Sequence, residues 1–166
     1  GFKGFGDLND IISDAHVYLT QDDRRFALDI ATGDLLWDVT LDDGEPVVGD
    51  VSGRITASDG VVYTNQNATL FAMDGSTGEE LWRRTFAGFS VHQPVIARDV
   101  VVVSSDAWEE DQLLANRLHG ISRETGNEVW RRDGRDQVFG YVAGHDGDVV
   151  LAVEYPASEL VLSDAD

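Results

Sequence analysis

A motif that recurs at a nearly constant interval constrains the fold of this chain more than any other feature. The pattern Ala-x-Asp-x-x-Thr-Gly-x-x-x-Trp occupies residues 27–37 and returns at residues 72–82, 45 residues later. A third copy at residues 120–130 follows after a further 48 residues, and residues 160–166 enter the motif once more. The recurring positions are Ala27, Asp29, Gly33, Trp37, Ala72, Asp74, Gly78, Trp82, Gly126 and Trp130. Agreement at several fixed positions indicates one supersecondary unit repeated along the chain.

The residues before each motif also repeat, as short β-branched or aromatic runs separated by Asp, Gly and Asn. Such runs predict antiparallel strands joined by tight turns. No window shows a sustained apolar stripe with a 3.6-residue period, which excludes a helical solenoid. Four strands per unit and a period above 40 residues predict an all-β chain of β-propeller blades. The predicted blades cover about residues 8–41, 52–87 and 92–133, with an incomplete fourth blade at about 137–166.

The Asp-x-x-Thr-Gly segment of the motif predicts a hairpin loop built on a type I turn. Glycine supplies the left-handed residue of such a loop, and the Asp side chain can bond back to the backbone. The small residues Ala27 and Ala72 are expected where a bulky side chain presses on the strand. The third copy departs from the pattern, because it has Gly120 and Ser122 in place of Ala and Asp.

This repeat resembles that of the pyrroloquinoline-quinone-like (PQQ-like) β-propellers, in which a tryptophan docks between blades. The resemblance covers nearly the whole chain from about Leu8 and amounts to about 3.75 repeats. It implies that each motif tryptophan stacks over a peptide of the neighbouring blade. Rings of this family have seven or eight blades, so the resemblance implies a partial propeller of about half a ring. Either further blades or a second chain then completes the ring, since residues 1–9 offer no Trp-ended strand for a closed four-bladed one.

The charge of the chain narrows the range of partners. The formal net charge is −19, Asp outnumbers Glu by 22 to 9, and Lys3 is the only lysine. This composition resembles that of proteins from halophilic archaea, whose self-repulsion is screened when molar salt shortens the Debye length to about 3 Å. An acidic surface disfavours binding to nucleic acid and to anionic membranes. No run of 18 apolar residues is present, so no direct membrane insertion is expected.

The sequence contains no pattern that predicts a catalytic or cofactor site. The absence of cysteine excludes disulfides, cysteine-ligated zinc and thiol catalysis. The family resemblance implies PQQ and calcium in the dehydrogenase members, commonly beside a vicinal disulfide that cannot form here. The four histidines fall at dissimilar repeat positions and form no metal-binding motif. We therefore expect no cofactor, no metal and no enzymatic activity.

Two local features stand outside the repeat. Asn67 begins an Asn-Ala-Thr sequon in a predicted turn and is a candidate glycosylation site. Trp108 lies in an acidic insertion, residues 106–111, which we predict to be a loop between the second and third strands of the third unit. Trp108 is a candidate partner contact, since exposed tryptophan is enriched at interaction hot spots, and the alternative is that it folds back on the blade edge.

Together these features predict a non-catalytic protein-binding or scaffolding propeller module. Its expected partner is a protein or a second copy that completes the propeller, and its expected location is extracytoplasmic or at the cell surface. Two other hypotheses remain open. One is a fragment of a quinoprotein dehydrogenase whose active site needs further blades, and the other is a sensor domain of a larger membrane protein.

Overall fold

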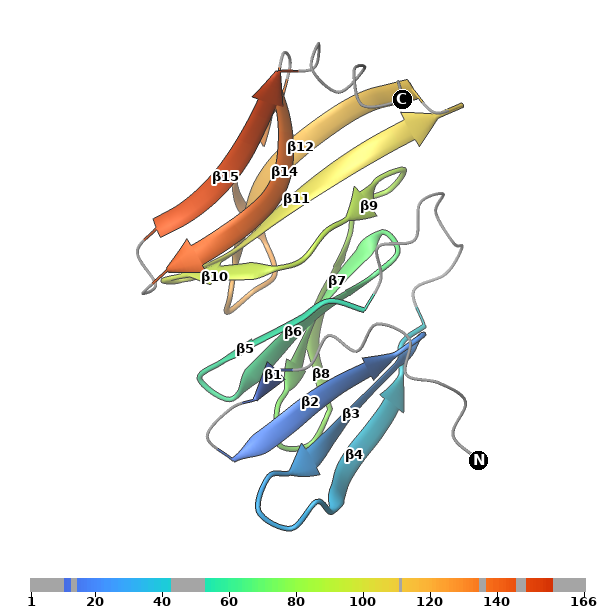
Figure 1. Ribbon diagram of the computed structural model, residues 1–166, viewed down its shortest axis with the longest axis vertical. Helices are drawn as coiled ribbons and strands as arrows, with labels where there is room; N and C mark the ends of the chain where they lie inside the picture. The colour runs from blue at the N-terminus through green and yellow to red at the C-terminus, as the bar shows by residue number, and fades with distance from the viewer. Residues whose placement is uncertain are drawn as a thin grey trace, which may run out of the picture.

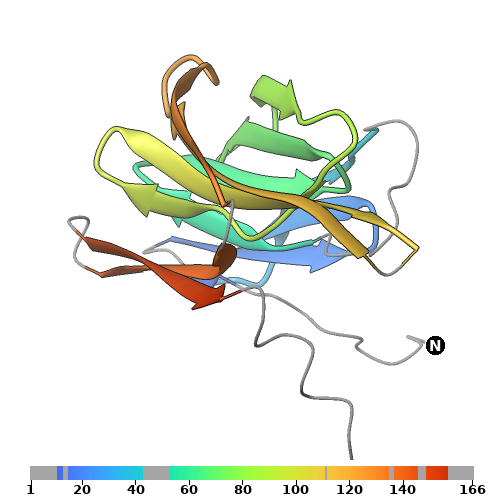
Figure 2. The same ribbon diagram turned by 90° about the horizontal axis from the view of Figure 1, so that it is seen from above.

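The computed structural model describes residues 11–12, 15–42, 53–110, 112–134, 137–145 and 149–156. Within these residues the chain forms antiparallel sheets that follow one another in sequence order, from β1–β4 at one end to β14–β15 at the other (Figure 1). Seen along this succession, the sheets overlie one another (Figure 2). The prediction of an all-β chain built from propeller blades is confirmed. The described part contains no helix with the length and hydrophobicity needed to cross a membrane.

Each of the first three sheets contains four strands that pair in chain order. In that order the strands are β1 (Ile11–Ile12), β2 (His16–Gln21), β3 (Arg24–Asp29), β4 (Leu35–Thr40), β5 (Ile55–Ser58), β6 (Val61–Gln66), β7 (Thr69–Asp74), β8 (Glu80–Thr85), β9 (Ser90–Val91), β10 (Val95–Ala97), β11 (Val100–Glu109), β12 (Gln112–Ser122), β13 (Glu128–Asp133), β14 (Gln137–His145) and β15 (Val149–Pro156). The third sheet has five strands, because β9 and β10 both pair with β11. The described residues of the fourth sheet are the pair β14–β15, and the motif start at residues 160–166 lies outside the described residues.

The strands at one edge of successive sheets lie next to one another. β5 contacts both β1 and β10, and β10 contacts β14, so these strands follow one another along one side of the molecule. The final strands β4, β8 and β13 lie on the outer side of their sheets. This radial order of strands is that of propeller blades around an axis.

The hydrophobic core lies in the seams between successive sheets. β6 and β7 are buried along almost their whole length, because the second sheet is covered on both faces. Trp37, Ile55 and Phe71 belong to the cluster between the first two sheets. Tyr63 and Val101 belong to the cluster between the second and third. The sheets are therefore held together by the residues that face each other across each seam.

The prediction of an acidic loop at residues 106–111 is wrong. β11 continues through Glu109, and β12 starts again at Gln112, so the insertion lengthens a hairpin (the long hairpin, residues 106–116). Residues 112–116 pair with the acidic run, and a bulge follows Ala107. Glu110 adopts a positive φ of 46°, which lets the chain reverse tightly. Sequence reasoning counted the added residues as loop because it did not find their partner strand.

Candidate functional site: the blade seams and the long hairpin

The Asp-x-x-Thr-Gly loops are closed by the Asp side chain and backbone. The carboxylate of Asp29 accepts hydrogen bonds from the backbone N–H groups of Ala31 and Thr32 at 2.8 and 2.9 Å. The N–H of Gly33 donates to the Asp29 carbonyl at 2.8 Å, and Gly33 has a φ of +75°. The two backbone donors, Thr32 first, lower the pKa of Asp29.

The second and third loops show how the motif tolerates change. Asp74 repeats the arrangement, and its pKa is lowered first by the side-chain hydroxyl of Ser76 and then by backbone N–H groups. In the third loop the hydroxyl of Ser122 accepts the N–H of Thr125 at 3.3 Å, a longer contact from a neutral acceptor. Gly126 still has a φ of +71°, so the loop keeps its shape without the carboxylate.

Trp37 of the first sheet docks onto the loop of the second sheet. Its indole Nε1–H donates to the carbonyl of Gly75 at 2.9 Å, and the side chain is only 7% exposed. A Cβ at Gly78 would lie 2.7 Å from the indole Cδ2 atom. Glycine is therefore required at position 78 both for its positive φ of 74° and for the approach of the ring.

Trp82 makes the equivalent contact with the third sheet. Its Nε1–H donates to the carbonyl of Arg123 at 2.8 Å, and a Cβ at Gly126 would lie 2.8 Å from the ring. This is the contact that the family resemblance implies for the repeat tryptophan. Trp130 differs, because its indole lies over Gly120 of its own sheet, in space that a Cβ there would occupy, and it is 37% exposed.

Sequence reasoning did not select two buried tyrosines that complete these seams. Tyr18 and Tyr63 are 2% and 1% exposed, and their rings lie 6.1 Å from Trp37 and 6.0 Å from Trp82. The Tyr63 hydroxyl accepts a hydrogen bond from Nε of Arg123 at 3.2 Å. The signal was present, because the two tyrosines are separated by the same 45 residues as the motif.

Arg25 is a second seam residue that the pattern alone did not identify. It is fully buried, and its guanidinium donates to Oγ1 of Thr64 and to the carbonyl of Asn65, each at 2.8 Å. The other two copies have leucine at this position, Leu70 and Leu118. An arginine in place of a repeated leucine was the available signal for a polar cross-link between sheets.

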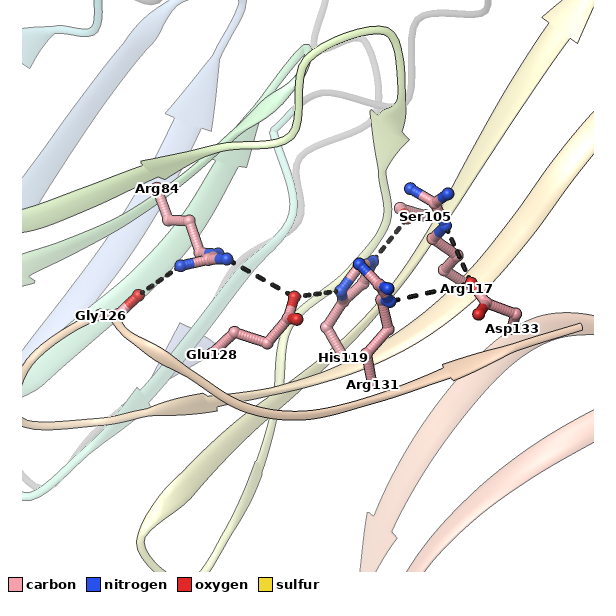
Figure 3. A network of polar contacts seen from close by, with 8 residues as sticks. All are labelled: Arg84, Ser105, Arg117, His119, Gly126, Glu128, Arg131 and Asp133. Carbon is pink, nitrogen blue, oxygen red and sulfur yellow. Dashed lines mark hydrogen bonds and ion pairs between the residues drawn. The ribbon is translucent and has the colours of Figure 1, made fainter.

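The third sheet contains a buried polar network that crosses to the second sheet (Figure 3). Nε2 of His119 lies 2.8 Å from Oγ of Ser105, and Nδ1 lies 2.9 Å from Oε2 of Glu128. Nη2 of Arg84, on β8, reaches the same Glu128 oxygen at 3.5 Å. The ring of Phe86 packs on the imidazole with centroids 4.7 Å apart. Burial lowers the pKa of His119, and the carboxylate of Glu128 opposes that shift.

The contacts run from Ser105 to His119 and from His119 to Glu128, which is the arrangement of a serine nucleophile, its general base and the acid that orients the base. Ser105 is 0% exposed, however, and its strand segment pairs with β9 on one side and β12 on the other. A substrate has no path to the hydroxyl in this arrangement. The network therefore acts here as a polar cross-link between two sheets.

The described residues do not fit a quinone–calcium centre. No group of three or more His, Asp or Glu side chains that could hold a metal ion occurs within the described part of the chain. The sequence also has no cysteine for a disulfide against a cofactor ring. No chemical step is therefore assigned to such a centre.

The long hairpin presents two large apolar side chains to solvent. Trp108 is 46% exposed and Leu114 is 58% exposed. Glu109 and Glu110 beside Trp108 are also exposed. At the base of the hairpin, Oδ2 of Asp106 lies 2.8 Å from Nε2 of His92, which ties it to the segment between β9 and β10. The structure thus places Trp108 on a strand with nearly half of its surface accessible.

The remaining candidates lie apart from one another. Asn67 occupies the turn between β6 and β7 with a φ of 48°, and its carbonyl accepts the N–H of Val91. The sequon residue Thr69 is buried and its hydroxyl lies 3.0 Å from that of Thr85. Nδ1 of His16 lies 3.2 Å from the Tyr18 hydroxyl, in the seam between the first two sheets.

Four-stranded antiparallel units joined by docked tryptophans define the chain as a β-propeller repeat protein of the PQQ-like class. The family model described as "Outer membrane protein assembly factor BamB" matches residues 21–165, and the chain therefore belongs to this PQQ-like family. No curated protein matches the chain.

Three solved structures show the same fold. BamB from Moraxella catarrhalis is 21% identical, with a TM-score of 0.59, over 84% of this chain and 41% of that protein. Quinohemoprotein alcohol dehydrogenase from Comamonas testosteroni is 21% identical, with a TM-score of 0.61, over 75% of this chain and 20% of the enzyme. The computationally designed protein Ika4 is 19% identical, with a TM-score of 0.57, over 94% of this chain and 95% of that one. The chain therefore spans only part of the two natural proteins.

Proposed function

We propose that this chain is a non-catalytic propeller module that binds another protein through the long hairpin. The observation that carries the proposal is the exposure of Trp108 and Leu114 on a strand extension that the first two sheets lack. The pairing of β11 with β12 fixes the backbone that carries these side chains before binding, which lowers the entropic cost of ordering them in a complex. Large exposed aromatic residues of this kind are enriched among the residues that dominate binding energy.

The exposed side chains of the hairpin indicate what kind of surface the partner has. Trp108 requires an apolar recess, and the exposed Glu109 and Glu110 beside it require cationic groups around that recess. Charge complementarity of this kind raises association rates and suppresses wrong partners. The partner is therefore a protein with a basic surface, and the surrounding acidic surface of this chain repels nucleic acid.

Site-specific photo-crosslinking tests the proposal in cells that produce the protein. A photoreactive phenylalanine derivative at position 108 is compared with the same residue at position 81, since Leu81 is 52% exposed on the outer strand of the second sheet. We expect an adduct with one protein at position 108 and none at position 81. Identical adducts at both positions would contradict the proposal.

The crosslinked protein then allows a quantitative measurement. With purified components, Trp108→Ala is expected to raise the Kd at least tenfold, which corresponds to about 1.4 kcal/mol. Leu114→Ser is expected to weaken binding less. Leu36→Ser, at an exposed position of the first sheet, is the matched control and leaves the Kd unchanged. Equal affinities for all four proteins would exclude the hairpin as the binding site.

The dehydrogenase-fragment hypothesis has one observation in its favour, the similarity to a quinohemoprotein alcohol dehydrogenase of which the chain covers 20%. It is tested by adding PQQ and calcium to the full-length protein. A cofactor spectrum together with alcohol-dependent dye reduction would replace the binding proposal by this alternative.

A salt-rich and extracytoplasmic setting is part of the proposal. Its support is the net charge of −19 with a single lysine, and the sequon at Asn67 is consistent with an outer surface. Because molar salt screens repulsion between carboxylates, we expect the Tm to rise steeply between about 0.1 and 2 M KCl. A Tm that stays flat over this range would count against the halophilic assignment.

A further inference from the structure

A hollow of about 340 Å³ (the first hollow) lies in the seam between the first two sheets, at the end where β5 turns into β6. It is lined by Ala15, His16 and Tyr18 of the first sheet and by residues 57–60 of the second. Its volume falls within the range of about 300–1,000 Å³ that is usual for small-ligand pockets. The first hollow is therefore large enough for a small group that contacts both sheets.

The first hollow brings together a phenol and a carboxylate that can accept hydrogen bonds. Tyr18 is 2% exposed, and its hydroxyl lies 3.2 Å from Nδ1 of His16. Asp59 stands at the rim, where its Oδ2 accepts hydrogen bonds from Arg123 and from the Ser58 hydroxyl, each at 2.8 Å. These two donors, Arg123 first, lower the pKa of Asp59, so the carboxylate is ionised at neutral pH. Within the described residues its other oxygen, Oδ1, makes no hydrogen bond and can accept one.

The second seam shows which group binds between the same elements one repeat later. Its hollow is lined by Asp59, Tyr63 and Arg123 among others, so Asp59 borders both hollows. Nε of Arg123 donates to the Tyr63 hydroxyl at 3.2 Å, Nη2 donates to Asp59 at 2.8 Å, and Nη1 donates to the Arg98 carbonyl at 3.1 Å. The Arg123 side chain is only 19% exposed. A phenol, a carboxylate and a turn carbonyl thus bind a guanidinium group in this seam.

The first seam keeps the phenol and the turn but has glycine in place of the arginine. Tyr18 and Tyr63 are 45 residues apart, and Gly75 stands at the repeat position of Arg123. A Cβ at Gly75 would lie 2.4 Å from the Tyr18 hydroxyl, so the backbone at position 75 leaves no room for a side chain. The first hollow therefore offers the acceptors of a guanidinium site without a guanidinium from position 75.

We propose that the first hollow binds a guanidinium group from outside the chain, supplied by an arginine of a partner protein or by a small free guanidine. Its N–H groups donate to the Tyr18 hydroxyl and to Oδ1 of Asp59, so that Asp59 bridges this group and Arg123. A planar guanidinium is favoured over an ammonium ion, because it presents several donors in one plane and is more weakly hydrated. The net charge of −19 attracts a cation to the site. The site shares no residue with the long hairpin, so this proposal and the proposed function can fail separately.

Amide chemical shifts of the labelled chain test the site, with methylguanidinium as the probe at constant ionic strength. We expect saturable shifts at His16 and Gly60 with a Kd of about 1–10 mM, since so small a ligand seldom binds more tightly. The amide of Asp99, in the equivalent turn of the third sheet, should not move, because Arg123 already binds there. Tetramethylammonium has the same charge and no N–H donor, and is expected to bind at least about threefold more weakly. Shifts that do not saturate, or equal binding of the two cations, would overturn the proposal.

A matched pair of variants separates the site from charge in general. Asp59→Asn is expected to raise the Kd for methylguanidinium about fivefold. Asp99→Asn removes an exposed carboxylate from the equivalent turn of the third sheet and should leave the Kd unchanged. Because Asp59→Asn also removes the ion pair with Arg123, Tyr18→Phe is the second variant. It keeps the buried ring, loses the acceptor and is expected to raise the Kd about threefold. Equal Kd values for the two Asn variants, or no change in Tyr18→Phe, would overturn the assignment.

Two larger compounds distinguish the possible sources of the guanidinium group. N-acetyl-L-arginine N-methylamide represents an arginine within a protein chain, and agmatine represents a free guanidine. Binding of the capped arginine at least as tight as that of agmatine would assign the site to a partner protein, and tighter binding of agmatine would assign it to a free guanidine. Failure of both compounds to displace methylguanidinium would overturn the proposal.

Discussion

The second and third sheets derive from the same repeat and use it differently. The second keeps Tyr63, Ala72 and Asp74 at the repeat positions, where the third has Val102, Gly120 and Ser122. The second sheet is buried on both faces, whereas the third replaces an aromatic residue by His119 and adds the long hairpin. The comparison indicates that the backbone of a blade depends on few positions, above all the loop glycine and the tryptophan it receives.

The two sheets are expected to differ most in the stability that each loses when its repeat tryptophan is replaced by alanine. Trp82→Ala is expected to lower the free energy of unfolding by about 3–5 kcal/mol, because it empties a seam and leaves the Arg123 carbonyl without its donor. Trp130→Ala is expected to cost about 1–2 kcal/mol, since that ring is 37% exposed and lies on its own sheet. Equilibrium unfolding in urea measures both, and equal losses would show that Trp130 is also a seam residue.

Substitution of a loop glycine is expected to change the free energy of unfolding by an intermediate amount. Gly126→Ala is expected to cost about 2–4 kcal/mol, because a positive φ disfavours alanine and its Cβ would collide with the docked Trp82. Gly33→Ala has only the backbone penalty and should cost about 1 kcal/mol. Equilibrium unfolding in urea measures the cost of both substitutions. If Gly33→Ala proves as damaging as Gly126→Ala, the first loop is covered in solution as the third loop is.

The smallest effect concerns the pH dependence of the third sheet. Burial lowers the folded-state pKa of His119 below its ordinary value of 6.5. The unfolded chain therefore takes up a proton first, and stability falls as the pH drops from about 6.5 towards the folded-state pKa. The charged groups around His119 are Glu128, Arg84, Arg117 and Arg131.

Phenylalanine, which the first two copies have at this position as Phe26 and Phe71, is the natural replacement. His119→Phe is expected to flatten the part of the stability curve between pH 7 and pH 5 that the histidine contributes. The difference in Tm between the two proteins over this range measures that part. Parallel curves would mean that Glu128 compensates the burial of the imidazole in full.

The sequence was sufficient to predict the blades, because their signals are local. Strand runs, loop glycines and motif tryptophans recur at fixed spacing, and each acts through its own hairpin or the next. The acidic insertion was misassigned because strand pairing of residues 106–109 depends on residues 112–116, and the Glu-Asp pair at positions 110 and 111 between them is not a hairpin-turn signal. The His119 network could not be predicted either, since Ser105, His119 and Glu128 meet through the pairing of three strands, and Arg84 joins them only when the second sheet packs on the third. Burial of Arg25 likewise depends on acceptors in the second sheet.

The two residues that dock in each seam are separated by few residues in the sequence, and this separation affects how such a chain can gain or lose blades. Trp37 docks on a residue 38 positions later, and Trp82 on one 41 positions later. The loop closed by each docking contact therefore has nearly the same length, so the entropy lost on closing it does not depend on the number of blades already formed. Folding can then proceed from one blade to its neighbour, as in linear repeat arrays. Insertion or loss of one whole repeat of about 45 residues would preserve every remaining seam, and a few residues added at the tip of a hairpin, as in the third repeat, also leave the seam in place.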